Sequence, residues 1–349
     1  MPIQSNILER TAIFSLNLVP GVMLDLAGAL AFQTLRLAAQ MGLFAALAER
    51  PFAAPELAQE LNCDERGVES LLRALASIGY VVEQDGRYRN SRLTEKWVLD
   101  TKVFNLDAAL TFWSAVFQEL SPQALGVMQT GERPYGNIYK WLESKPDISH
   151  AFQQQLMASV TLAGPDVVKK LKLSSTAARV LDVGGGHGLF SILLCQQHPQ
   201  LQATVLDSAV ALQTAEVNID HHDLADRIHL HQGDLWQEDW VDGYDVILLF
   251  NLIHHYDTKQ NIELLRRCYA ALKRGGRVAI LDQIEGKVPG NVASAFIRLI
   301  ALHYFLLADG RVYAHDDIQS WFQQTGFTMA QSHRVLKLPG TSLMVAKKR

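Results

Sequence analysis

A glycine-rich turn near the middle of the chain is the first feature that could do chemistry. The sequence there runs Val180-Leu-Asp-Val-Gly-Gly-Gly-His-Gly188, a strand-like segment that leads into a turn and then a helix. Glycines have no Cβ, so the backbone of such a turn can approach a ligand closely. By itself the motif fits a nicotinamide dinucleotide as well as other adenosine-bearing ligands.

Carboxylates at the ends of three successive apolar segments narrow this choice. Asp182 precedes a predicted helix N-terminus. A dinucleotide site would leave this helix end free of acids so that it can bind pyrophosphate, whereas a carboxylate here favours a cationic ligand such as an aminoacyl sulfonium. Asp207 closes the next segment, where a carboxylate can accept both hydroxyls of a ribose. Asp234 follows the third and could hold an adenine amino group, with Leu235 against the ring. The alternative for each acid is an ordinary turn or helix cap.

A second polar cluster, Asn251-Leu-Ile-His-His-Tyr-Asp257, follows the apolar segment 246–250. Polar residues at the carboxyl end of a central strand lie where open α/β sheets bind ligands. His254 is the candidate general base, because an imidazole can accept a proton near neutral pH. Asp282 ends the next predicted strand and could fix the tautomer of His254. We interpret residues 255–257 as the start of a helix.

The elements that position these residues alternate between short apolar runs and helices from Ala178 onward. This rhythm predicts a doubly wound parallel sheet. Two final runs joined by Pro339-Gly340 predict a hairpin, so the sheet should end with an antiparallel strand. The predicted strands are 179–183, 203–206, 228–231, 244–250, 276–282, 327–335 and 341–347, and the predicted helices begin at Leu189, Val210, Lys259 and Asp316.

The first hundred residues follow a helical pattern. Residues 22–49 are predicted to be a helix too apolar to stand alone in water. Residues 51–98 read as helix, turn, longer helix and a hairpin at Asp85-Gly86, the pattern of a winged helix. This segment has six basic and eight acidic residues. DNA binding is therefore disfavoured, because phosphate neutralisation supplies most non-specific affinity, and we expect dimerisation instead.

Residues 101–175 are predicted to be helical and rich in aromatic side chains, among them Tyr135, Tyr139 and Trp141. At helical spacing such side chains are usually core, although a segment between domains can also wall a substrate pocket. The apolar run 296–307 is the expected opposite wall. The chain thus divides into a dimerisation domain (1–100), a helical linker (101–175) and a ligand-binding domain (176–349).

Composition limits the class of protein. The 349 residues are 48% hydrophobic and carry a net charge of −4, which favours a globular protein and argues against broad binding of nucleic acids or anionic membranes. The three cysteines, Cys63, Cys195 and Cys268, form no pair motif, so we expect a reducing cytoplasm and no structural zinc site. No metal ligands are assigned, although His303 could join His254 in a metal site as a minor alternative. The N-terminal apolar stretch 13–32 is interrupted by Asn17, Pro20 and Asp25, and no membrane span is predicted.

Together these motifs resemble the two-domain small-molecule O-methyltransferases of the caffeic-acid and acetylserotonin type, which include many bacterial members that tailor secondary metabolites. The resemblance covers nearly the full length. It implies a class I methyltransferase sheet of the α/β class with an antiparallel last strand, preceded by a mostly α-helical winged-helix dimerisation domain. It also implies a homodimer, S-adenosyl-L-methionine as cofactor and S-adenosyl-L-homocysteine as product.

By this match Gly184, Asp207, Asp234 and Leu235 would contact the cofactor, His254 would be the general base, and Asp282 would orient it. Asp182, Gly186 and Asn251 complete the candidate cofactor set. The chain departs from the family in having His255-Tyr256 in place of an Asp-Trp pair and Asp282 where Glu is frequent. Val312 follows Gly310-Arg311, so a second supporting glutamate is missing.

The expected function is therefore methyl transfer to a hydroxyl of a small, aromatic metabolite. The absent glutamate leaves N- or C-methylation open. A non-methylating enzyme on the same fold is a further alternative, and a winged-helix regulator that senses S-adenosylmethionine is disfavoured by the acidic second helix.

Overall fold

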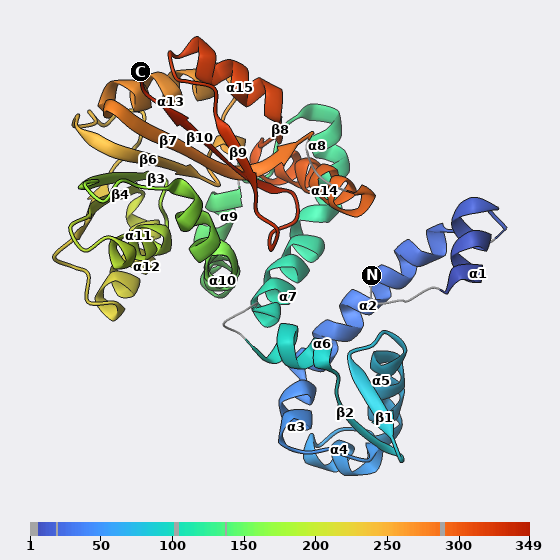
Figure 1. Ribbon diagram of the computed structural model, residues 1–349. Helices are drawn as coiled ribbons and strands as arrows, with labels where there is room; N and C mark the ends of the chain where they lie inside the picture. The colour runs from blue at the N-terminus through green and yellow to red at the C-terminus, as the bar shows by residue number, and fades with distance from the viewer. Residues whose placement is uncertain (1–5, 19, 101–104, 137, 287–289) are drawn as a thin grey trace. The chain divides into compact units, whose positions relative to one another are not determined.

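A computed structural model describes residues 6–18, 20–100, 105–136, 138–286 and 290–349. The chain divides into two compact units. The first comprises Met1–Gln118 with Asp147–Ala158, and the second comprises Glu119–Pro146 with Ser159–Arg349. The segment 101–175, predicted as one linker, is shared between the two units, and its residues 101–104 lie outside the described ranges. Figure 1 follows the chain from its N-terminus to its C-terminus.

The first unit contains the predicted winged helix. Asp64 caps α5 by accepting from the Gly67 N–H, and the hairpin turns at Asp85 and Gly86, which have φ of 52° and 73°. Its regular elements are α1 (Ile7–Arg10), a π-helical turn (Thr11–Ser15), α2 (Val22–Gln40), α3 (Leu43–Glu49), α4 (Ala54–Glu60), α5 (Glu65–Ser77), β1 (Val81–Gln84), β2 (Arg87–Asn90), α6 (Arg92–Thr94), a π-helical turn (Glu95–Leu99) and α7 (Leu106–Ala115).

The apolar segment 22–49 forms two helices rather than the one predicted. Gly42 adopts a φ of 71°, a left-handed conformation that ends α2 and allows α3 to start in a new direction. α2 leaves one apolar face uncovered, made of Val22, Met23, Leu26, Leu30 and Leu37. Among the described helices α2 also has the length and composition to cross a membrane.

The second unit contains the sheet and the helices that pack on it. A π-helical turn (Val116–Leu120) and the helix α10 (Pro146–Leu171) belong to both units. The other elements are a 3₁₀ turn (Ser121–Gln123), α8 (Ala124–Thr130), α9 (Ile138–Glu143), β3 (Arg179–Val183), α11 (Leu189–Gln197), β4 (Gln202–Asp207), α12 (Ala209–His221), β5 (Ile228–Gln232), β6 (Tyr244–Phe250), a 3₁₀ turn (Ile253–His255), α13 (Thr258–Ala271), β7 (Leu272–Glu285), α14 (Asn291–Ala308), β8 (Tyr313–Ala314), α15 (His315–Gln324), β9 (Gln331–Arg334) and β10 (Thr341–Lys347).

The strand order is β5-β4-β3-β6-β7-β10-β9, with β8 paired to β7 beside this path. Strands β3 to β7 are mutually parallel, whereas β10 pairs antiparallel with both β7 and β9. The predicted doubly wound sheet and its final hairpin are thus confirmed. The observed strand β7 is longer than the predicted strand 276–282, because its pairing with β6 and β10 extends beyond both predicted ends.

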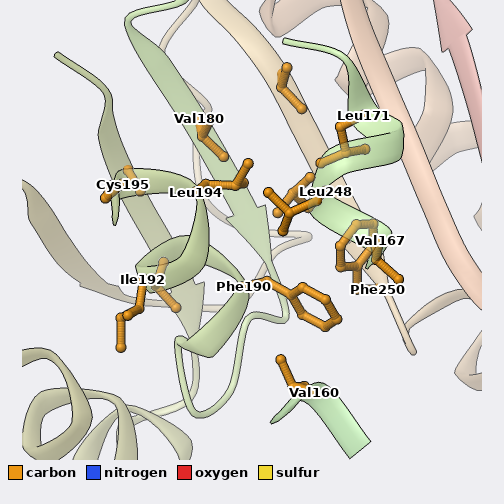
Figure 2. Packing of buried hydrophobic residues seen from close by; sticks show 14 of the residues in the cluster. Val160, Val167, Leu171, Val180, Phe190, Ile192, Leu194, Cys195, Leu248 and Phe250 are labelled. Atoms are coloured by element: carbon orange, nitrogen blue, oxygen red, sulfur yellow. The ribbon is translucent and has the colours of Figure 1, made fainter. Parts of the chain in front are cut away.

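A hydrophobic core lies on each face of this sheet. One is formed with α10, α11 and α12, and the other with α13 and α15 (Figure 1). Figure 2 shows the first core, where Val167 and Leu171 of α10 and Phe190 of α11 lie against Leu248 and Phe250 of β6. The rings of Phe190 and Phe250 pack edge to face, with their centroids 4.6 Å apart. These cores hold the strand ends rigidly, which is what a precise site requires.

Chain order reverses at β3, which pairs with β4 on one side and β6 on the other. Crevices at such a switch point, beyond the carboxyl ends of the strands, are where open α/β sheets bind ligands. The segments that follow β3, β4 and β6 therefore define the place to look for a site.

Candidate active site

The glycine turn after β3 is built for close approach. Gly184, Gly186 and Gly188 have φ of 67°, 50° and 72°, a region that residues with a Cβ rarely adopt. The Gly184 N–H donates to the Leu206 carbonyl at the end of β4, at 2.8 Å. A Cβ on Gly184 would lie 2.7 Å from Cδ1 of Leu252. The turn is thus locked against both neighbouring strand ends. A Cβ at position 184 would force the Leu252 side chain to move and would strain a backbone conformation that favours glycine.

Asp207, the last residue of β4, faces this turn. Its Oδ2 accepts from the Gly186 N–H at 2.8 Å, and its Oδ1 accepts from the Ser208 N–H at 2.7 Å. Burial raises the pKa of the Asp207 carboxyl above its ordinary value, although both N–H groups favour the charged form. A carboxylate with this placement has further lone pairs to accept hydroxyl donors.

Asp182 lies underneath the turn rather than on its outer side. The residue is buried, and its Oδ2 accepts from the Ser191 hydroxyl at 2.8 Å. An added Cβ on Gly185 would meet the Asp182 carboxyl carbon at 2.7 Å, so the carboxyl group packs directly against the turn. Burial, together with the charge of Asp207, raises the pKa of Asp182 to about 7. The geometry places Asp182 as a support of the turn.

The predicted residues at the tips of β5 and β6 lie where the sequence placed them. Asp234 is exposed and accepts from the Trp236 N–H at 2.9 Å, while Leu235 is buried in the second core. Asn251 follows β6 with a φ of 51°, and its N–H donates to the Leu281 carbonyl at 2.7 Å. All three are therefore at the carboxyl edge of the sheet.

His254 and Asp282 meet as a hydrogen-bonded pair. Nδ1 of His254 lies 2.9 Å from Oδ1 and 3.0 Å from Oδ2 of Asp282, and both residues are buried. Because an ionised carboxylate only accepts, Nδ1 carries the proton and the opposite nitrogen, Nε2, has a free lone pair. Nε2 has no hydrogen-bond partner among the described residues. A histidine in this state can take up a proton.

Three aromatic residues complete this cluster. Sequence reasoning named Tyr139 only as part of a segment that could wall a pocket, assigned His255 to a helix start and did not select Tyr304. The Tyr304 ring of α14 stacks on the His254 ring, with 4.4 Å between the ring centroids and 15° between the ring planes. The centroid of the His255 ring lies 4.1 Å from that of His254. Nε2 of His255 lies 2.9 Å from the Tyr139 hydroxyl of α9. Burial, and then the charge of His254, lower the pKa of His255 well below its ordinary value. Periodicity could indicate only that these residues lie on helices or turns.

A pocket is present between α8, α9 and α14. Its walls are mostly apolar and include Trp141, whose indole N–H donates to Glu119 at 3.1 Å. Arg133 lines it but is held by the Phe305 carbonyl and Asp309. The lining residues are Leu120, Ser121, Ala124, Val127, Arg133, Pro134, Tyr135, Ile138, Trp141, His303, Leu306 and Leu307. His254, Tyr304 and Tyr139 are not among these lining residues.

The doubly wound sheet with its antiparallel last strand has the class I methyltransferase fold. The model of the O-methyltransferase domain matches residues 115–328, and that of the O-methyltransferase dimerisation domain matches residues 24–100. The chain belongs to the O-methyltransferase family. It is an S-adenosyl-L-methionine-dependent enzyme of that family.

Named relatives span nearly the whole chain. The 3-hydroxy-5-methyl-1-naphthoate 3-O-methyltransferase of Streptomyces sahachiroi is 29% identical over 334 residues, covering 94% of each chain. The L-tyrosine C(3)-methyltransferase of Streptomyces lavendulae is 27% identical and covers 89% of this chain and 87% of its own length. Human N-acetylserotonin methyltransferase in complex with S-adenosylmethionine superposes with a TM-score of 0.78 over 94% of this chain and 96% of its own, at 20% identity. The last comparison confirms the predicted fold.

The residues present fit S-adenosyl-L-methionine. Around Gly186 an added Cβ would meet, among the described residues beyond its chain neighbours, only the Asp207 carboxylate, at 4.0 Å. That side of the turn therefore has room for a ligand beside a carboxylate that can accept further hydrogen bonds. No group of three metal-binding side chains occurs among the described residues.

Proposed function

We propose that this enzyme moves the methyl group of S-adenosyl-L-methionine to a hydroxyl of a small aromatic metabolite, with His254 as the general base. One observation carries the assignment: the His254–Asp282 pair lies at the same sheet edge as the glycine turn and Asp207. Methyl donor and base would therefore share one site. S-adenosyl-L-methionine supplies, when bound, a methyl group on a positively charged sulfur.

Each candidate cofactor residue has its own proposed task. The backbone at Gly184 and Gly186 would approach the cofactor closely, and the Asp207 carboxylate would accept the ribose hydroxyls. Asp234, Leu235 and Asn251 would border the adenine and the amino-acid end from the tips of β5 and β6. Asp182 would act through the turn that it supports.

The proposed proton transfer follows from the tautomer of His254. The Nδ1–H bond to Asp282 leaves Nε2 to remove the proton of the acceptor hydroxyl. That oxygen would take the methyl carbon as the sulfur–methyl bond breaks, and the leaving group would be the neutral thioether S-adenosyl-L-homocysteine. The buried Asp282 carboxylate would stabilise the imidazolium that results. A positioned base of this kind contributes about 10²- to 10⁴-fold in rate. Alignment of acceptor and methyl group can supply roughly 7–11 kcal/mol of the barrier.

The proposed acceptor is aromatic because several relatives carry aromatic substrates in their names, among them a naphthoate and an aminohydroxybenzoate. The aromatic rings of Tyr304, His255 and Tyr139 around the base offer flat, partly apolar surfaces that suit such a ring.

The proposed assembly is a homodimer formed through the apolar face of α2. Five large apolar side chains on this helix are at least half exposed, and the helix lies mostly within the matched dimerisation domain. A run of large apolar side chains exposed on one face of a helix is typical of a protein interface. Binding of DNA or a membrane is not part of this proposal. A cytoplasmic location is proposed from the three cysteines, which are all unpaired.

The test is methyl transfer from labelled S-adenosyl-L-methionine to a panel of phenols, with mass spectrometry to locate the methyl group. His254→Ala should lower kcat on the best acceptor by about 10²-fold or more. His229→Ala, an exposed histidine of the edge strand β5, is the matched control and should keep full activity. Undiminished kcat in His254→Ala removes the base from the mechanism. A methyl group on carbon or nitrogen would replace the proposed hydroxyl acceptor.

A further inference from the structure

The ring of His254 is supported on its edge and on its face by different residues. Asp282 holds the edge through Nδ1, while the Tyr304 ring covers a face at 4.4 Å with an angle of 15° between the planes. A hydrogen bond at one atom leaves an imidazole able to tilt about that bond. A stacked ring opposes this tilt, because every tilt brings the two surfaces into contact.

The hydroxyl end of the Tyr304 side chain is itself held by a hydrogen bond. Its hydroxyl donates to Oε1 of Gln283 at 2.6 Å, and Nε2 of Gln283 donates to the Thr341 hydroxyl at 3.4 Å. Gln283 is the next residue after Asp282 on β7, and its N–H donates to Oδ1 of Asp282 at 2.8 Å. The face support and the edge support of His254 are thus anchored at adjacent positions of one central strand.

The backbone after α14 brings Tyr304 against His254. The Gly310 N–H donates to the Tyr304 carbonyl and the Arg311 N–H donates to the His254 carbonyl, each at 2.9 Å. A Cβ on Gly310 would lie 2.9 Å from the His254 carbonyl oxygen and 3.1 Å from Cβ of Tyr304. Gly310 therefore allows a close approach of α14 to the histidine that a larger residue would prevent.

The residue that follows this pair, Val312, has no charge with which to hold an imidazole. Asp282 is the only side chain hydrogen-bonded to the His254 ring among the described residues. We propose that Tyr304 is a positioning residue for the methyl transfer, and that its stacked ring supplies a second support of His254 that the apolar Val312 cannot give. The inference rests on the proposed role of His254 as the base.

Stacking on a phenol also suits the charge that His254 acquires. The face of an aromatic ring attracts a cation, so the imidazolium formed during the reaction is stabilised where it stacks. The other titratable groups facing His254 are Asp282 from β7 and His255 from the adjacent position, with Tyr139 of α9 behind His255. Burial, and then the charge of Asp282, raise the pKa of Tyr304 well above its ordinary value, so its hydroxyl remains a donor to Gln283.

Tyr304→Phe keeps the ring, and Tyr304→Leu removes it. We expect Tyr304→Phe to stay within about 3-fold of the wild-type kcat and Tyr304→Leu to lose about 20-fold or more, with Kd for S-adenosyl-L-methionine changed less than about 3-fold. The acidic limb of the pH profile of kcat should move to lower pH in Tyr304→Leu only, because a less stabilised imidazolium forms at lower pH. Tyr313→Phe, which removes a buried hydroxyl that donates to the Tyr256 carbonyl, is the control for a general packing effect and should retain activity.

A double-mutant cycle separates positioning from folding. Because Tyr304 acts through His254, Tyr304→Leu should lower kcat less than 2-fold further in a His254→Asn background. Where thermal unfolding shows that Tyr304→Leu does not fold, Tyr304→Met, which has similar length and no ring, replaces it. Equal losses in Tyr304→Phe and Tyr304→Leu, unchanged kcat in Tyr304→Leu, or an additive loss in the cycle would each overturn the inference. Full activity of His254→Asn alone would instead overturn the proposed function.

Discussion

The imidazole of His254 and the carboxylate of Asp282 are 2.9 Å apart although 28 residues separate them in the chain. The contact follows from strand register: β6 and β7 are parallel neighbours in which Phe250 pairs with Leu281, so the residues just beyond these positions emerge together. The helix α13 between them returns the chain to the start of the sheet. A base and its orienting acid are thereby held by the rigid centre of the fold.

Asp282→Asn should lower kcat by about 10²-fold or more, with KM for the acceptor changed far less. An amide can present its N–H to Nδ1 and so select the wrong tautomer, and it cannot stabilise the imidazolium. Asp282→Glu restores the charge on a longer arm and should recover part of the loss. Steady-state kinetics with one acceptor at saturating S-adenosyl-L-methionine measures both variants. Equal activity of Asp282→Asn and wild type would contradict the assigned tautomer.

Asp207→Ala should weaken binding of S-adenosyl-L-methionine by about 10-fold or more, because charge-assisted hydrogen bonds to hydroxyls are each worth roughly 1.5–3 kcal/mol. Isothermal titration calorimetry of the purified protein gives Kd directly. Asp220→Ala, an exposed acid near the end of α12, is the control with an equal change of charge. Similar Kd values for the two variants would remove Asp207 from the cofactor site.

Gly184→Ala should abolish measurable cofactor binding and lower the melting temperature. The added Cβ would lie 2.7 Å from Cδ1 of Leu252, and the alanine backbone would have to keep a φ of 67°. The steric overlap and the backbone strain would both destabilise the turn. Gly126→Ala is the opposite case, since Gly126 lies within α8 and an added Cβ there has no neighbour within 4 Å among the described residues. It should stabilise the fold by up to about 1 kcal/mol through helix propensity. Differential scanning fluorimetry with and without cofactor compares the two.

Asp182→Asn should change how stability depends on pH. Burial raises the pKa of Asp182 to about 7, so the native state binds its proton more tightly than the unfolded chain does. Stability from this group is therefore greatest at low pH and is lost as the pH rises from about 4 to about 7. The asparagine can still accept from Ser191 and carries no charge, so the variant should gain roughly 1–3 kcal/mol over wild type at pH 8 and little at pH 4.

Urea unfolding at these two pH values measures the difference. Asp220→Asn, at an exposed position, should leave the pH dependence as in the wild type. A gain for Asp182→Asn that is the same at both pH values would show that the effect comes from packing rather than from the charge.

Leu26→Glu combined with Leu30→Glu should convert the proposed dimer to a monomer. Both side chains are more than half exposed on one face of α2, at 53% and 61%, and two carboxylates there cannot be buried against a partner copy without a large desolvation cost. Glu49→Gln, on the exposed surface of α3, is the control. Sedimentation velocity at micromolar concentration reports the mass. A wild-type chain that already sediments as a monomer would refute the dimer.

The sequence by itself determined the sheet and most of the strand ends. Alternation of apolar runs and helices is a local pattern, and parallel neighbours have only a few possible orders, so Asp207, Asp234 and His254 could be placed at one edge before any contact was known. The start of α3 was missed because the left-handed conformation of Gly42 leaves no periodic trace.

Only the tertiary structure decided what surrounds the base. Tyr304 lies 50 positions after His254 on a mostly apolar helix, so the sequence pattern does not indicate which ring faces the imidazole. Tyr139 reaches His255 from a helix more than 100 residues earlier. Asp182 lies one residue before the end of its strand, but the direction of its side chain, toward Ser191 and beneath the turn, depends on how α11 packs. Such contacts arise from the packing of distant elements, which short-range sequence patterns do not encode.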